Sequence, residues 1–293
     1  MRQSIFEKMD NLWDFSSALT RINKLFEKEK LMVIDDRAYY SLREFFAKYC
    51  FDKWISNCHR VNFDDFLNEL KYSQLLSNAV HFQSEDDMIS YIEIIANCIY
   101  VFERQYPPEM KNIDHCVHTL PKFNALKGNI YDVLDNLNMD IKYVPDRERV
   151  LLLEKNAAVT AAAEISSDET AYEIITYNHH TLKGDIKEKA KILSYLANGF
   201  EAQRGMINRI NFDLANDIAC LLNNLNIRHN NVDQSVRSYH STVADMSSTE
   251  LESWYDELYQ MLLLARLEID NIERKKKVSE LKEKMEGERR NNG

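Results

Sequence analysis

One short polar segment of the chain gathers side chains that could act on a phosphodiester. The letters NNLNIRHNNVD, from residue 223 to residue 233, place side-chain amides around an adjacent arginine and histidine. The Arg228 guanidinium stays cationic and can stabilise the added negative charge of a phosphorane. The His229 imidazole titrates near neutrality and can move the proton of a 2′-hydroxyl. These residue types predict an RNA-binding or RNA-cleaving site with Arg228 and His229 in catalytic roles.

The remaining polar side chains of this segment would orient the catalytic groups or bind substrate. Amides donate and accept hydrogen bonds, and an aspartate accepts them, so these groups could hold a ribose or a phosphate. The candidates for this role are Asn223, Asn230, Asn231 and Asp233. Asparagine-rich segments that follow a helix also act simply as caps and turns, which is their commoner role. On the residues alone, both interpretations stay open.

The same segment resembles the HEPN superfamily (higher eukaryotes and prokaryotes nucleotide-binding domains). The resemblance consists of a helix ending in an apolar residue and Arg228, then His229-Asn230-Asn231, then a long amphipathic helix, and it covers at most residues 185–275. It implies a helical bundle that is commonly dimeric and often a metal-independent ribonuclease of toxin and phage-defence systems. Arg228 matches the arginine of the family motif, and His229 and Asn230 match its polar follow-on.

The chain departs from that family motif at the histidine expected a turn or so after the arginine. Val232, Asp233 and Gln234 occupy those positions, while His229 is nearer to the arginine and His240 is farther away. The resemblance therefore implies either a divergent site that uses His229 or His240, or a member that has lost cleavage. In the second case RNA binding or dimerisation alone would remain.

Other chemical motifs carry less weight. The letters DHCVH, from Asp114 to His118, contain potential metal ligands, and His115 and His118 could share one face of a helix. Further ligands at a recognisable spacing are missing, so we expect ordinary histidines and no metal site. The sequence lacks a phosphate loop, a GxGxxG turn, a nucleophile elbow and an HExxH motif. We therefore expect no cofactor and none of the common nucleotide or hydrolase chemistries.

The composition predicts a mainly α-helical protein. Of 293 residues, 45% are hydrophobic and 11% are aromatic, which is too apolar for a disordered chain. Only six glycines and four prolines occur, whereas a sandwich or barrel needs many tight turns. Apolar residues recur at helical spacing in most of the chain. We expect a helical bundle made of two packed halves.

A change of pattern at Asp140 predicts the division between those halves. The letters IKYV, PDRE and RVLLLE read as a short β-hairpin over residues 141–154, although the second run could also be helical. We expect a helical N-terminal region over residues 1–139. Residues 140–293 would form the HEPN-like domain that begins with the hairpin.

The last long helix is the element that would follow and support the polar segment. It is expected to open at the capping box Ser247-Ser-Thr-Glu250 and to carry an apolar stripe from Leu251 to Ile272, of which the part from Trp254 to Ile272 could supply part of a homodimer interface. The basic run Lys275–Lys277 is expected to be a solvated helix face. The later apolar residues, Val278, Leu281 and Met285, are too sparse to demand a coiled coil.

Charge and cysteine usage bound the setting. The net charge of −10 means that an RNA site needs a local basic surface that acts against the field of the whole chain. Five scattered cysteines without CxxC spacing, no apolar signal core and no apolar run of about 20 residues favour a cytoplasmic protein without a membrane span.

The leading hypothesis is an HEPN-like ribonuclease or RNA-binding protein of a bacterial defence or toxin system; the alternative is a non-catalytic helical interaction or scaffold protein.

Overall fold

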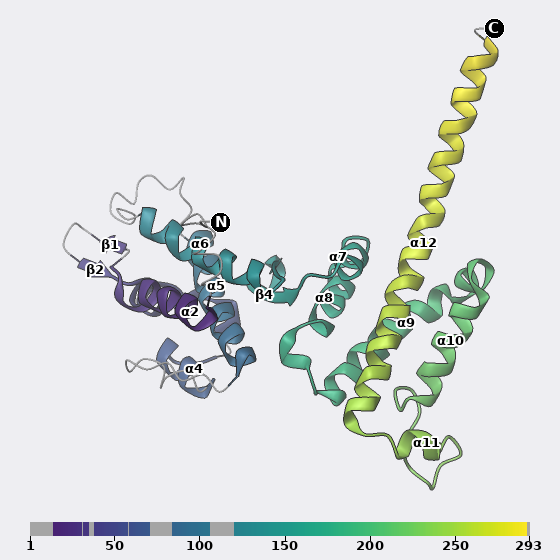
Figure 1. Ribbon diagram of the computed structural model, residues 1–293, viewed down its shortest axis with the longest axis horizontal. Coiled ribbons are helices and arrows are strands. Elements are labelled where there is room, and N and C mark those ends of the chain that lie inside the picture. Colours follow the sequence, from purple (N-terminus) through teal and green to yellow (C-terminus); the bar gives the residue numbers. More distant parts are fainter. Residues whose placement is uncertain are drawn as a thin grey trace, which may run out of the picture. The chain divides into compact units, whose positions relative to one another are not determined.

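The chain forms a mainly α-helical fold that contains a short β-hairpin, as the composition predicts (Figure 1). The computed structural model describes residues 14–30, 32–34, 38–57, 59–70, 84–105 and 120–291. The histidine motif at residues 114–118 lies outside these ranges. Two compact units divide the chain, Met1–Lys155 and Asn156–Gly293. Among the described residues, no helix has the length and apolar character that a membrane crossing requires.

Unit 1 is built around one long buried helix, α5. Its residues include Ile92, Ile95 and Cys98, which are all completely shielded from solvent. A cluster of aromatic rings from Phe46 to Phe66 packs with edge-to-face and tilted contacts in the same core. The elements of this unit are α2 (Phe15–Asn23), η1 (Lys24–Lys28), β1 (Met32–Ile34), β2 (Ala38–Tyr40), α3 (Leu42–Phe45), η2 (Phe46–Cys50), η3 (Phe51–Lys53), η4 (Ile55–Asn57), α4 (Phe63–Glu69), α5 (Glu85–Gln105), α6 (Leu120–Asn136), β3 (Met139–Val144), η6 (Pro145–Arg147) and β4 (Arg149–Glu154).

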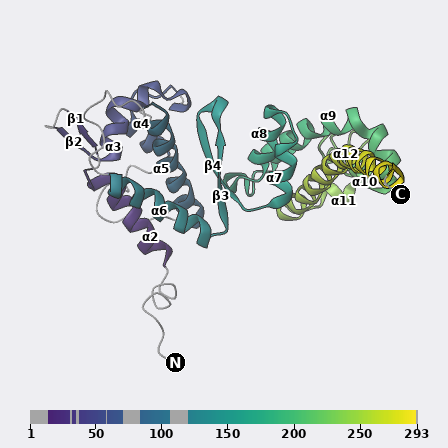
Figure 2. The ribbon, with the colours of Figure 1, turned by 90° about the horizontal axis from the view of Figure 1, so that it is seen from above.

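The hairpin expected near residues 141–154 is confirmed, and it belongs to unit 1. Strands β3 and β4 pair antiparallel from Met139 opposite Glu154 to Val144 opposite Arg149, and Figure 2 shows them beside α5. The free edge of β4 is covered by side chains of α5. The Asn97 amide donates to the Val150 carbonyl at 2.8 Å and accepts from the Val150 N–H at 2.9 Å, and the Glu93 carboxylate accepts from the Leu152 N–H at 2.7 Å.

These bonds explain why the units divide after Lys155 rather than at Asp140, where we expected the division. An exposed strand edge leaves backbone N–H and C=O groups unpaired, so the element that pairs them determines where the strand packs. No change in composition along the sequence marks that pairing. The two α5 side chains that make it lie more than 40 residues before the hairpin.

A buried carboxylate in unit 1 makes its stability depend on pH. Glu27 lies on η1, a turn of π-helix, with its Oε2 3.3 Å from Nε of Arg43. Burial raises the pKa of Glu27 from 4.5 to about 7, and this effect outweighs the attraction of Arg43, which lowers the pKa. The protonated form is therefore the one that the folded state prefers. The stability that the protonated Glu27 contributes is fully present below pH 4.5, and it is lost as the pH rises through about 7.

We expect Glu27→Gln to remove most of this pH dependence. As the pH rises from 5 to 8, the unfolding free energy of the variant should rise by about 1–3 kcal/mol relative to that of the wild type. The reason is that the glutamine amide stays neutral, whereas Glu27 of the wild type ionises. Urea unfolding of both proteins at the two pH values measures the difference. Equal pH dependence in the two proteins would contradict a raised pKa at Glu27.

Unit 2 is a bundle in which α9, α10 and α12 pack against one another, with α7 and α8 on the same core (Figure 1). Asp185 caps α9 by accepting the Glu188 N–H at 3.0 Å. The Ser247 hydroxyl accepts the Glu250 N–H at 3.2 Å at the start of α12. The elements are α7 (Ala157–Glu164), α8 (Asp168–Tyr177), η7 (His180–Leu182), α9 (Ile186–Ile210), α10 (Phe212–Asn224), α11 (Ser241–Ala244) and α12 (Ser248–Asn291).

The two ends of α12 have different surroundings. In the first part, Leu258, Leu262 and Ala265 are buried in the core of unit 2 itself. Most of the apolar stripe that we expected at a dimer interface is therefore used inside the unit. From residue 271 to residue 286, in contrast, every residue is exposed, and this part of α12 extends beyond α9 and α10 (Figure 1).

Candidate functional site

The polar segment forms a folded-back loop between α10 and α11, which we call the polar loop (residues 225–240). Asn226 ends α10 by adopting a left-handed backbone conformation, with φ of +57°. Asparagine tolerates this conformation better than other non-glycine residues. The Tyr255 hydroxyl of α12 donates to the Leu225 carbonyl at 3.0 Å, so the start of the loop is attached to the buried face of the last helix.

Asn231 holds the polar loop closed. Its side-chain oxygen accepts the Asn226 N–H at 2.9 Å, and its own N–H donates to the Asn226 side-chain oxygen at 3.1 Å. The Asn231 side-chain amide also donates to the Ser238 carbonyl at 2.7 Å. Asn231 is completely buried. We expected Asn231 to bind substrate; the structure corrects this, because its polar atoms are spent on the loop and no solvent reaches it.

The closure brings the two ends of the polar loop together. The His240 N–H donates to the Asn231 carbonyl at 2.9 Å, and the Ser238 hydroxyl donates to the Asn230 carbonyl at 3.0 Å. His240 is thus placed beside a residue nine positions earlier in the chain, two residues after His229. Both histidines are exposed. In the part of the chain that the structure describes, no hydrogen bond joins the two imidazoles or links either of them to Arg228.

Arg228 is held by a carboxylate from a different helix. Its Nη1 donates to Oε1 of Glu201 on α9 at 2.8 Å, and the Arg228 side chain is 23% exposed. Glu201 also lies 3.7 Å from Arg204. The arginine is therefore reachable from solvent, but a phosphate would have to compete with one carboxylate for it. Sequence reasoning missed Glu201, because it precedes Arg228 by 27 residues and no motif relates the two.

The other predicted site residues shape the loop locally. Asp233 accepts the Ser235 hydroxyl at 2.7 Å and the Ser235 N–H at 2.9 Å, and these hydrogen bonds lower the pKa of the Asp233 carboxyl. The Asn230 amide lies 3.5 Å from Asp233, and both are accessible to solvent. Asn223 lies on the last turn of α10 and is half-buried. Asn230 and Asp233 thus lie on the same exposed turn, whereas Asn223 lies before it.

A charged network joins helices α8, α9 and α12 of unit 2. The Lys189 ammonium of α9, in a residue only 6% exposed, lies 2.7 Å from Glu252 and 2.8 Å from Asp256, both on α12. The Tyr177 hydroxyl donates to the same Asp256 oxygen at 2.9 Å. Burial raises the pKa of the Tyr177 phenol, and the Asp256 carboxylate adds to this effect. Three helices of unit 2 therefore meet at one buried cation.

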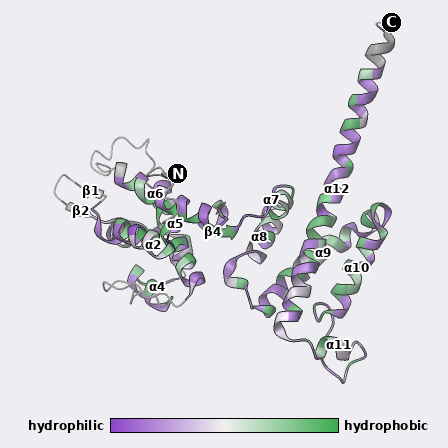
Figure 3. Ribbon diagram, viewed as in Figure 1, coloured by the Kyte–Doolittle hydropathy of each residue, from purple (hydrophilic) through white to green (hydrophobic). Residues whose placement is uncertain are grey.

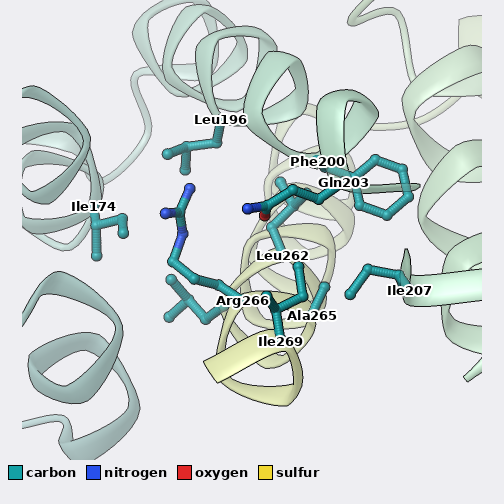
Figure 4. A pocket seen from close by; sticks show the side chains of 10 residues that line it. Ile174, Leu196, Phe200, Gln203, Ile207, Leu262, Ala265, Arg266 and Ile269 are labelled. Carbon is teal, nitrogen blue, oxygen red and sulfur yellow. The ribbon is translucent and has the colours of Figure 1, made fainter. Parts of the chain in front are cut away.

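A small apolar cavity between α9 and α12 contains one further arginine. The Arg266 guanidinium lies among side chains such as Ile174 and Leu196 (Figure 4), and burial lowers its pKa. Among the described residues no carboxylate pairs with it. The cavity has a volume of about 20 Å³, which is roughly enough for one water molecule. It therefore offers no room for a nucleotide or another substrate.

Arg228, His229, Asn230, Asp233 and His240 are thus the predicted site residues that the polar loop leaves accessible to solvent. The comparisons add no name to this geometry: no protein-family model matches the chain, and no match is found among curated proteins or solved structures.

Proposed function

We propose that the polar loop of unit 2 binds RNA and that its histidines cleave the bound strand without a metal ion. The observation that carries this proposal is the fold-back at Asn231, whose carbonyl accepts the His240 N–H at 2.9 Å. It attaches a second exposed histidine to the turn that carries Arg228 and His229. In this proposal His240, whose backbone contacts Asn231, takes the place of the motif histidine that is missing at residues 232–234.

Each group has a chemical role in this proposal. Arg228 releases Glu201 and binds the scissile phosphate in its place. A guanidinium can make this exchange because a carboxylate and a phosphate can each accept two parallel hydrogen bonds from it. His229 or His240 removes the 2′-hydroxyl proton, and the other protonates the leaving oxygen. Asn230 and Asp233 orient these groups. As the HEPN resemblance implies, a second copy of the chain would complete the site in a bacterial defence or toxin system.

The charge of the chain sets the expected strength of binding. A net charge of −10 repels RNA at long range, and Glu201 reduces the local positive potential. Few phosphates can be contacted by so small a basic surface. We therefore expect weak binding with a shallow dependence on salt concentration.

Arg228→Ala tests the proposal directly. Wild-type protein is incubated with a mixed RNA pool in EDTA, and the products are examined for 2′,3′-cyclic phosphate ends. We expect cleavage by the wild type and about a 100-fold loss in the variant, as for removal of one group that stabilises developing charge. Arg274→Ala is the matched control, because it removes the same charge from an exposed site on α12.

The outcomes separate cleavage from binding. Cleavage that Arg228→Ala abolishes and Arg274→Ala retains supports the ribonuclease. RNA binding without cleavage, weakened only by Arg228→Ala, supports the RNA-binding role alone. If the folded wild type neither binds nor cleaves RNA, or if both variants behave alike, the polar loop has no RNA function.

A second candidate function is a non-catalytic helical interaction protein. The observation that favours it is the exposed part of α12, in which residues 271–286 contact no core. A helix that contributes nothing to the packing of its own unit is available to another molecule. The side chains along this part of α12 indicate what that molecule would be.

A further inference from the structure

The exposed part of α12 (residues 271–286, the α12 extension) carries an apolar seam. Val278, Leu281 and Met285 are 50%, 58% and 49% exposed, and their spacing of three and four residues is that of a, d and a positions in a heptad repeat. Figure 3 shows the free end of α12 as mostly hydrophilic, with a few separate hydrophobic positions. In the same register, the polar residues Asn271 and Arg274 occupy the preceding a and d positions, so the seam consists of Val278, Leu281 and Met285.

The chain itself does not cover this seam in the described residues. All sixteen residues of the α12 extension are exposed, so no tertiary contact stabilises this stretch of about four turns. Isolated helices of this length are marginal in water, and burial of an amphipathic face is what usually stabilises them. A second helix packed along the seam would supply that burial.

The charges beside the seam have one sign. Lysines occupy the e and g positions that flank it, and no ion pair involves any of them in the part of the chain that the structure describes; they are Lys275, Lys277, Lys282 and Lys284. Glutamates occupy the positions on the far side of the helix; they are Glu273, Glu280, Glu283 and Glu286. The residues that a partner helix would meet first are therefore apolar in the middle and basic at both edges.

This arrangement disfavours a second copy of the chain. In a parallel pair, Lys277 of one copy would lie opposite Lys282 of the other, and the same contact would occur twice by symmetry. In an antiparallel pair, lysines would again face lysines along both edges. Like charges at these positions oppose pairing.

The far face of the helix disfavours the other anionic occupants. Helices that lie on a membrane surface carry basic residues over the whole polar face, whereas the polar face here contains four glutamates. RNA binds mainly through its phosphates, so an apolar seam between two narrow rows of lysine offers it few favourable contacts. An apolar stripe with acidic edges complements both features at once.

We propose that the α12 extension binds an acidic amphipathic helix of another protein. That helix has leucine or isoleucine at its a and d positions and glutamate or aspartate at its e and g positions. Its apolar side chains cover Val278, Leu281 and Met285, and its carboxylates pair with the flanking lysines. This inference rests on the interaction function and is independent of RNA binding at the polar loop.

A pair of synthetic peptides tests the proposal with the full chain. Both peptides are about four heptads long with isoleucine and leucine at a and d; one has glutamate at every e and g position and the other has lysine there. Binding of each labelled peptide is followed by fluorescence anisotropy at low and high salt. We expect the glutamate peptide to bind, and salt to weaken its binding, while the lysine peptide does not bind.

Three variants make the test specific to the seam. Leu281→Asp should weaken binding of the glutamate peptide about tenfold or more, whereas Val232→Asp, an exposed apolar residue of the polar loop, should leave it unchanged. The double change Lys277→Glu with Lys282→Glu should exchange the preference of the chain from the glutamate peptide to the lysine peptide. All four positions are exposed, so each variant should fold.

Other results overturn the proposal and identify the alternative. Self-association of the wild type that Leu281→Asp abolishes, measured by light scattering, would assign the seam to a second copy and retain an interaction function. Sedimentation with phosphatidylserine vesicles that the same variant abolishes would assign it to a membrane surface. Equal affinity for both peptides, or no binding of any probe, would contradict both the acidic partner helix and the interaction function.

Discussion

Lys189→Met is expected to destabilise unit 2 by about 3 kcal/mol, one of the two largest effects of a single substitution considered for this chain. The ammonium is buried and contacts two carboxylates, Glu252 at 2.7 Å and Asp256 at 2.8 Å. Methionine fills a similar volume but leaves both carboxylates without their cation. Glu252 has a side chain only 16% exposed, so it cannot recover full hydration. The half-exposed Asp256 can, which keeps the cost at the lower end for a broken buried ion pair.

The surroundings of Glu252 strengthen this expectation. Burial alone would raise the pKa of the Glu252 carboxyl, but hydrogen bonds from the Gly184 N–H and from Lys189 bring it below its usual value. Removal of Lys189 leaves the burial and takes away one of the compensating groups. We therefore expect the pKa of Glu252 to be higher in the variant than in the wild type, so that the variant loses more stability than the wild type as the pH rises through that pKa.

Urea unfolding of wild type and Lys189→Met at pH 7 measures the effect. Lys191→Met is the matched control, because Lys191 lies on the same helix with its side chain 72% exposed and pairs with the exposed Glu188. An exposed pair of this kind contributes little, so the control should change stability by less than about 1 kcal/mol. Equal losses in the two variants would show that the buried cation contributes no more than a surface one.

Asn231→Ala is expected to destabilise unit 2 by about 2–4 kcal/mol and to open the polar loop. The side chain is completely buried and satisfies two backbone groups, the Asn226 N–H and the Ser238 carbonyl. Alanine leaves both groups without these partners, and each such loss in a buried setting costs roughly 1–3 kcal/mol. Hydrogen exchange should accelerate at the amides of Asn226 and His240, since the latter is bonded to the Asn231 carbonyl.

Asn230→Ala separates a structural asparagine from a substrate-binding one. Asn230 is exposed, and its amide makes only a 3.5 Å contact with Asp233, so its removal should change stability by no more than about 0.5 kcal/mol. If Asn231→Ala instead unfolds at the wild-type urea concentration but loses RNA binding, Asn231 would be a substrate ligand after all. That result would restore the role that its residue type suggested.

Periodicity along the sequence was sufficient for the elements that are defined by local interactions. The β-hairpin follows from two short apolar runs around Pro145-Asp146, and helices α9 and α12 follow from apolar residues at helical spacing behind Asp185 and Ser247. Caps and turns involve residues within four positions of each other, so their signals are contained in a short stretch of sequence. The polar loop was predicted in the same way, because its side-chain amides lie close together in the sequence around Arg228 and His229.

Tertiary structure alone decided which of those asparagines face solvent and where the units divide. Asn230 and Asn231 are adjacent and chemically identical, yet one is exposed and the other is completely buried. When the loop folds back, the Asn231 side-chain amide bonds to the Ser238 carbonyl, whereas Asn230 contacts Ser238 through its backbone carbonyl. Glu201 reaches Arg228 from another helix, and Asn97 holds β4 from 53 residues away. Contacts between residues far apart in the chain depend on how the helices pack, and no local pattern records them.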